Sequence, residues 1–233
     1  MIKPDVIVSW PRNNDYPLWR QFIRDNRERF AKVIVVFTET NQGANFRTFV
    51  TEAMSEDDVI FMESPTYRGE QDWRNVAVNC ALEISDSSWV WFTEQDFYPQ
   101  DGFWSYVDTL FARGYDVIAT YDAGRMHPCN ILIRRWTLNR THKNFGIVPD
   151  VADHFGQIQI DLEGMDIKIG KVRDDAYFHY NGLSHNFTLM SRGEDPNYKK
   201  DEFDEYLNKC LNVTVPLEPG FVNLVRGYLE YQR

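Results

Sequence analysis

The sequence lacks the features that mark several large classes of protein. No apolar stretch approaches the ~20 residues that a helix needs to cross a bilayer, and the opening MIKPDVIVSW lacks the long apolar region of a signal peptide. The chain has only 3 cysteines, and no two have the C-x-x-C spacing, which disfavours a disulfide scaffold or a zinc site. We therefore expect a cytoplasmic protein, or a viral protein that acts in the cytoplasm of a host cell.

Glycine-rich phosphate loops are also absent. The sequence contains no G-x-x-x-x-G-K-S/T, which excludes the usual kinase and ATPase loops, and no G-x-G-x-x-G for a dinucleotide. No G-x-S-x-G turn is present, which disfavours an α/β-hydrolase. The loop after the first predicted strand has no glycine, whereas nucleotidyltransferases usually open with a glycine-rich loop that ends in a basic residue.

The composition describes a folded, acidic protein. Its 233 residues fit one domain, or one domain with a C-terminal appendage, and 43% hydrophobic residues exclude a disordered chain. The net charge of -10 opposes broad contact with nucleic acid or an anionic membrane. The stretch 134–143 is locally basic and could meet an anionic partner, although a solvated helix face is the alternative.

Strand-like and helix-like patterns alternate along the chain. Apolar, β-rich runs predict buried strands at 5–10, 32–37, 59–62, 89–93, 116–121, 130–134 and 166–172. Apolar residues at helical spacing predict helices at 16–30, 71–84, 101–113 and 151–164, a short one at 45–54, and C-terminal helices at 199–210 and 222–231. This order predicts an α/β fold with a mostly parallel central sheet flanked by helices.

Two carboxylates directly follow the fourth predicted strand. Residues 89–93 are apolar and stop at Glu94-Gln95-Asp96. In an open parallel sheet, ligands bind beyond the carboxyl ends of the strands, and carboxylates spaced i, i+2 can share one divalent cation with a diphosphate. Such a cation neutralises a phosphate leaving group. The alternative is an acidic surface loop.

The residues around this motif resemble the donor-binding half of GT-A glycosyltransferases, in the style of family two. In that family a helix bearing Arg and Asn, here DWRNVAVNCA at 72–81, precedes an apolar strand ending in Asp-x-Asp, here WVWFTEQD at 89–96. The resemblance covers roughly residues 5–182 and implies a GT-A domain at 1–198, with 199–233 as a helical extension packed on it. It also implies Mn²⁺ or Mg²⁺ as cofactor, bound directly by Asp96, with Glu94 facing the ribose or a metal-bound water.

The same resemblance implies a catalytic base near residue 153. Residues 150–169 are similar to the acidic-pair helix of the family, so Asp153 is the candidate base that accepts the proton of the acceptor hydroxyl. His154 replaces the usual second acid and could itself serve, and Asp150 is a rival. The alternative role for Asp153 is a helix N-cap.

A histidine that follows the acidic helix is the expected second metal ligand. His179, in YFHYNG at 177–182, fits by position, and neutral imidazole suits Mn²⁺. His185 is the fallback, and a buried core histidine is the alternative. We expect His127 to lie in a loop that lines the acceptor cleft, without a role of its own.

The first two strand ends are expected to hold the nucleotide. By the resemblance, Ser9, Trp10 and Arg12 contact the base, Thr38 helps to close the pocket, and Gln95 lies on the donor side. Arg74 would reach a phosphate as a planar bidentate donor, or instead pair with Glu70 on the helix surface.

Together these features predict a nucleotide-sugar-dependent hexosyl- or pentosyltransferase. UDP is expected as the nucleotide of the donor only because it is common in such enzymes. Direct displacement with inversion would follow if Asp153 is the catalytic base. The acceptor could be a glycan, a lipid-linked sugar or, as the minority interpretation, a modified nucleic-acid base. The alternative is a non-catalytic nucleotide- or glycan-binding relative, because Glu94 and His154 depart from the acids of the family.

Overall fold

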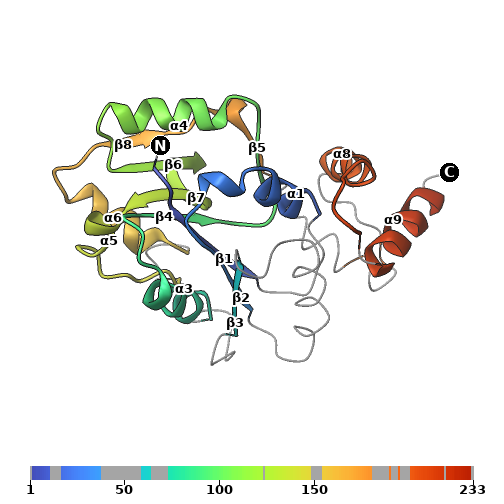
Figure 1. The fold of residues 1–233 in the computed structure, drawn as a ribbon, viewed down its shortest axis with the longest axis horizontal. Coiled ribbons are helices and arrows are strands. Elements are labelled where there is room, and N and C mark those ends of the chain that lie inside the picture. The colour runs from blue at the N-terminus through green and yellow to red at the C-terminus, as the bar shows by residue number, and fades with distance from the viewer. Residues whose placement is uncertain are drawn as a thin grey trace.

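The computed structural model describes residues 2–10, 17–37, 59–63, 73–122, 124–147, 154–179, 189, 194, 200–217 and 219–231. Within them, a central sheet has the strand order β3-β2-β1-β4-β7-β6-β8 (Figure 1). Its strands are β1 (Asp5–Trp10), β2 (Val33–Phe37), β3 (Val59–Glu63), β4 (Trp89–Thr93), β6 (Val117–Asp122), β7 (Arg125–Arg134) and β8 (Ile169–Lys171). A second, small sheet pairs β5 (Phe97–Pro99) with β9 (Tyr177–His179).

Most strand pairs of the central sheet are parallel. Strands β3, β2, β1 and β4 run parallel to one another, and β8 runs parallel to β6. Strand β7 lies antiparallel between β4 and β6. The predicted fold class, a mostly parallel sheet flanked by helices, is therefore confirmed.

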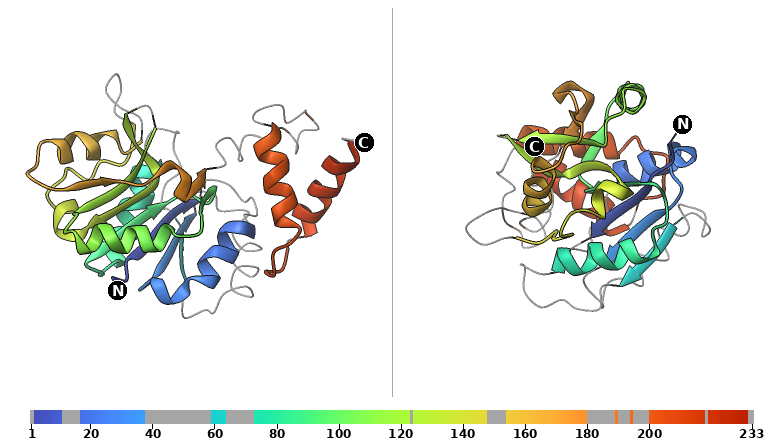
Figure 2. Two further views of the ribbon diagram at one scale, coloured as in Figure 1. Left: turned by 90° about the horizontal axis from the view of Figure 1, so that it is seen from above. Right: turned by 90° about the vertical axis from the view of Figure 1, so that its left-hand side faces the viewer.

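Both faces of the sheet are buried, which explains the continuous apolar runs of the central strands. Alternate residues of a strand point to opposite faces, so Val6 and Val8 join one core cluster and Ile7 joins the other. The first cluster includes side chains of α1 (Pro17–Asp25) and α4 (Phe103–Ala112), and the second includes those of α3 (Trp73–Ile84) and α6 (Gly156–Glu163). Figures 1 and 2 show α4 and α3 on opposite sides of the sheet.

Several predicted boundaries were wrong. Helix α6 begins at Gly156 and not at 151, because Phe155 has a left-handed backbone (φ 63°) and packs its ring into the core against Phe92. Strand β7 is longer than the predicted 130–134. Helix α9 (Pro219–Tyr231) begins before the predicted 222 and includes Pro219, because proline is well tolerated in the first turn. The predicted helix at 45–54 lies outside the described residues.

The first of the two C-terminal helices packs against α1. Helix α8 (Lys200–Cys210) contacts α9 through Phe203 and Tyr228, whose ring centroids are 5.3 Å apart. The fully buried Arg20 of α1 donates to the backbone carbonyl of Pro216 at 2.8 Å. The boundary at 198/199 between domain and extension stays a prediction. Among the described residues, no helix has both the length and the apolarity that crossing a membrane requires.

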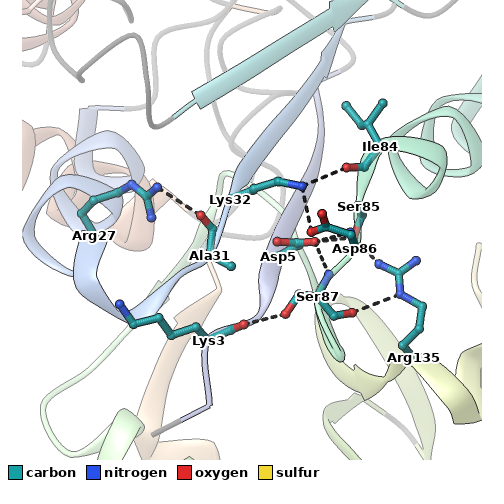
Figure 3. Close-up of polar contacts among 10 residues, drawn as sticks. All are labelled: Lys3, Asp5, Arg27, Ala31, Lys32, Ile84, Ser85, Asp86, Ser87 and Arg135. Atoms are coloured by element: carbon teal, nitrogen blue, oxygen red, sulfur yellow. Dashed lines mark hydrogen bonds and ion pairs between the residues drawn. The ribbon is translucent and has the colours of Figure 1, made fainter.

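A buried carboxylate ties together the amino ends of β1 and β4 (Figure 3). Asp5, which is 0% exposed, accepts hydrogen bonds from the Ser85 hydroxyl at 2.7 Å and from the backbone N–H groups of Asp86 and Ser87, both at 2.9 Å. Arg135 adds a bond from its Nε to the Ser87 carbonyl at 3.2 Å. This network lies at the opposite edge of the sheet from the carboxyl end of β4.

Replacing Asp5 with alanine is expected to lower the free energy of unfolding by about 3 kcal/mol, because one buried and two partly buried donors lose their acceptor. Urea denaturation of both proteins would measure this change. Asp86→Ala is the matched control, because the Asp86 side chain is 80% exposed and only pairs with Lys32 at the surface. An Asp5→Ala protein as stable as the control would contradict a structural role for the network.

Candidate metal and donor site

Three predicted site residues lie next to one another at the carboxyl end of β4. Glu94, Gln95 and Asp96 form the turn between β4 and β5, and the N–H of Glu94 donates to the Cys129 carbonyl of β7 at 3.2 Å. Strand β5 then pairs antiparallel with β9, with Phe97 directly opposite His179. The small second sheet therefore brings His179, from far along the chain, to the two carboxylates.

The three side chains are close enough to share one ion. His179 Nε2 is 3.4 Å from Asp96 Oδ1 and 3.6 Å from Glu94 Oε2. The potential ligand atoms of Glu94, Asp96 and His179 all lie within 4.8 Å of one another. Each side chain is between 15% and 17% exposed, so the group is mostly buried but still reached by solvent. Two carboxylates and one imidazole form a suitable donor set for Mn²⁺.

The electrostatics of this group also fit a cation. Burial by itself lowers the pKa of His179, but the charges and hydrogen bonds of Asp96 and Glu94 outweigh burial and raise it to about 10. The carboxylates therefore favour a positive charge between them. Asp96 Oδ1 is buried, and His179 Nε2 lies 3.4 Å from it. A buried acceptor of this kind is satisfied when it binds a cation.

The prediction for His127 was wrong. His127 lies in β7 and not in a loop, and its ring centroid is 4.6 Å from that of His179. Its Nδ1 accepts the backbone N–H of Cys129 at 3.2 Å. The alternation of a strand places His127 and Cys129 on one face of β7, and both potential ligand atoms lie within 4.8 Å of one in His179. The i, i+2 spacing in the sequence was the available signal.

The remaining predicted donor residues are only partly described. Ser9 and Trp10 end β1, which pairs with β4 in a register that matches Val8 with Thr93. Their backbones therefore lie at the same edge of the sheet as Glu94, whereas nothing is described of their side chains. Gln95 is buried, at 6% exposed. Arg74 lies in the first turn of α3, and its side chain is likewise not described.

The predicted catalytic residues cannot all be compared with the structure. His154 is partly buried and lies directly before Phe155, the residue that precedes α6. The N-cap of α6 is Phe155, so the N-cap role considered for Asp153 does not apply to this helix. Asp153 lies outside the described residues, as do the remaining candidates Arg12, Thr38, Glu70, Asp150 and His185.

The basic stretch 134–143 is largely engaged in contacts within the chain. Arg134 pairs with Asp116 at 3.1 Å, and its guanidinium lies 5.1 Å from the ring centroid of Trp89. Arg135 belongs to the Asp5 network, and the Arg140 guanidinium lies 5.3 Å from the centre of the Trp136 ring. These contacts favour a structural role for the stretch over an anion-binding surface.

Comparisons with known proteins give a fold but no sequence relative. Neither a protein-family profile nor the sequence of a curated protein matches the chain. Residues 1–349 of TarS from S. aureus match with a TM-score of 0.53 at 15% identity, over 91% of this chain and 71% of that fragment. Glucosyl-3-phosphoglycerate synthase from M. tuberculosis matches with a TM-score of 0.50 at 14% identity, over 73% and 70%.

A third structure with this fold comes from a different class of enzyme. It is 4-diphosphocytidyl-2C-methyl-D-erythritol synthase from Anaerococcus prevotii, with a TM-score of 0.50 at 11% identity, over 73% of this chain and 88% of that one. Identities this low establish shared architecture and not shared chemistry. The chain therefore has the fold of GT-A type glycosyltransferases.

Proposed function

We propose that this protein transfers a sugar from a nucleotide-sugar donor to an acceptor hydroxyl, with a divalent cation at Glu94, Asp96 and His179. The observation that carries this proposal is the convergence of these three side chains within 4.8 Å at the carboxyl end of β4. In open α/β sheets this edge is where ligands bind.

Each residue has a distinct part in the proposed reaction. Asp96 and His179 would bind Mn²⁺ or Mg²⁺ directly, and Glu94 would face the ribose or a metal-bound water. The cation would offset the charge that develops on the diphosphate leaving group. Arg74, at the start of α3, would contact a phosphate as a bidentate donor.

The first strand ends would complete the donor pocket. Ser9, Trp10 and Arg12 would contact the nucleotide base, which we propose is uracil. Thr38 would close over this base, and Gln95 would lie on the donor side of the turn between the metal ligands. Asp153, or His154 beside it, would accept the proton of the acceptor hydroxyl as that oxygen attacks the anomeric carbon. Attack opposite the leaving group would invert the configuration of the sugar.

A glycan or lipid-linked sugar is the acceptor that we favour. A nucleic-acid acceptor would need a basic surface, but the net charge is -10. Arg134 and Arg135, in the most basic stretch, contact Asp116 and Ser87 within the fold. The name of the M. tuberculosis neighbour describes the synthesis of a glucosylated acid, which is compatible with transfer of a hexose here.

Nucleotidyl transfer is the second candidate, because the A. prevotii neighbour is named for a diphosphocytidyl product. Residues 11–16, with the sequence PRNNDY, contain no glycine. A sequence without glycine is poorly suited to wrap a triphosphate with its backbone N–H groups. A metal-binding histidine close to the two carboxylates favours glycosyl transfer instead.

Incubating the protein with UDP-, GDP- and CDP-sugars and Mn²⁺ is expected to release a nucleoside diphosphate from one donor, because water can replace the acceptor slowly. Chromatography of the nucleotides would identify the product. A nucleoside monophosphate together with a sugar phosphate would indicate attack on phosphorus and would contradict sugar transfer. No release from any donor, with or without metal, would favour the non-catalytic binding relative.

A further inference from the structure

A second group of potential metal ligands adjoins the proposed metal site. Strand β7 pairs antiparallel with β4, matching Asn130 with Thr93, and the Glu94 N–H bonds to the Cys129 carbonyl. Cys129 and His127, on the neighbouring strand β7, therefore lie at the same edge of the sheet as the carboxylates. The sequence motif for the donor site includes neither residue.

The geometry of this second group is as compact as that of the first. The potential ligand atoms of His127, Cys129 and His179 lie within 4.8 Å of one another. Metal–ligand bonds of about 2.0–2.3 Å place two ligands of one ion at most about 4.6 Å apart, so this spacing is close to that of a shared ion. Both groups include His179, so two carboxylates, a second imidazole and a thiol are grouped with a single imidazole.

The chemistry of the combined set differs from that of a carboxylate site. Mg²⁺ prefers oxygen ligands and keeps several waters, whereas imidazole and thiolate favour Zn²⁺ and Co²⁺. Cys129 is 1% exposed, and its Sγ lies 3.3 Å from the hydroxyl of Thr120. Burial, followed by the charges of Glu94 and Asp96, raises the pKa of this thiol well above its usual value. A coordinated metal ion removes the proton of such a thiol.

We propose that His127 and Cys129 complete the metal centre of the donor site, and that this centre therefore prefers Zn²⁺ or Co²⁺ to Mg²⁺. The inference rests on the proposed function, because it concerns the same centre. Binding replaces the S–H bond of Cys129 with a sulfur–metal bond and releases the thiol proton to solvent. The cysteine spacing had disfavoured a zinc site, but strand pairing supplies the ligands here instead of a C-x-x-C turn.

Titration of the metal-free protein with Co²⁺, followed by absorption spectroscopy, tests this inference without any measurement of turnover. The wild type is expected to show a thiolate-to-cobalt charge-transfer band in the near ultraviolet. Cys129→Ser should lose the band, and Cys80→Ser, on α3, should keep it. His127→Ala should weaken Co²⁺ binding by about tenfold or more. His142→Ala should not, because His142 is 78% exposed and bonds to Asp161.

The same proteins distinguish failure of this inference from failure of the proposed function. If the wild type binds Co²⁺ without the band and His127→Ala binds it equally well, the centre consists of Glu94, Asp96 and His179, and this inference is overturned. Metal-dependent UDP binding, measured alongside, would then still support the donor site. If the wild type shows the band but binds none of the nucleotides in the separate binding measurement, the inference is supported and the donor-site proposal is overturned. Competition in which Mg²⁺ displaces Zn²⁺ at equal concentration would overturn the stated preference.

Discussion

Asparagine in place of Asp96 is expected to lower the rate of the proposed sugar transfer by about 10³-fold. The substitution keeps the shape of the side chain but removes the charge that binds a divalent cation. A metal ion contributes several kcal/mol to such a reaction, and each 1.4 kcal/mol or so corresponds to a tenfold change in rate. Steady-state assays with the donor identified by nucleotide release would measure the loss.

The matched control for this variant is Asp108→Asn on α4. Asp108 accepts a hydrogen bond from Arg29 at 2.9 Å and is 42% exposed, so the change tests a carboxylate of the outer surface. Turnover of the control should remain close to that of the wild type. Equal losses in both variants would indicate general damage to the fold, and full activity of Asp96→Asn would remove Asp96 from the metal centre.

The metal-free protein is expected to lose stability as the pH rises from 6.5 to about 10. The lower value is the ordinary pKa of a histidine, and the higher one is the pKa of His179 in the folded protein. Asp96 and Glu94 raise this pKa in the folded state despite burial. A raised pKa contributes stability that is fully present below the unfolded value and is lost as the pH rises through the folded value. The loss over this window is on the order of 5 kcal/mol, at about 1.4 kcal/mol for each pKa unit.

Urea denaturation in the presence of a chelator, at several pH values, would measure this loss. The matched variant is His179→Gln, whose amide stays neutral throughout. We expect the variant to be less stable than the wild type near pH 6.5, where the imidazolium offsets two carboxylates. Its stability should then change little across the window. A variant with the same pH dependence as the wild type would contradict the assignment of the effect to His179.

The strands could be predicted from the sequence where burial on both faces is continuous. Strands β1, β2 and β4 are runs of β-branched and aromatic residues because the parallel part of the sheet is covered by helices on both sides. Strand β7 was predicted too short, because its first half contains His127 and Pro128 and has no apolar pattern. The start of α6 could not be predicted, because the left-handed backbone of Phe155 is set by packing of its ring.

The site could be predicted to the extent that its residues are close in the sequence. Glu94 and Asp96 form a local pattern after an apolar strand, which carries chemical meaning by itself. His179 required the order of elements known from a family, because only the pairing of β5 with β9 brings it to Asp96. His127 and Cys129 have the i, i+2 spacing of one strand face, but only the antiparallel pairing of β7 with β4 brings them to the carboxylates.

Calorimetric titration of UDP, GDP and CDP is the most direct test of the donor site, performed with Mn²⁺ and with a chelator on the wild type and on Asp96→Asn. One nucleotide should bind only in the presence of the metal, and the variant should lose that binding. Such a result would establish the donor site at Glu94, Asp96 and His179 and identify the base. If no nucleotide binds with or without metal, the transferase proposal is wrong, and the turn after β4 is only an acidic loop next to a histidine.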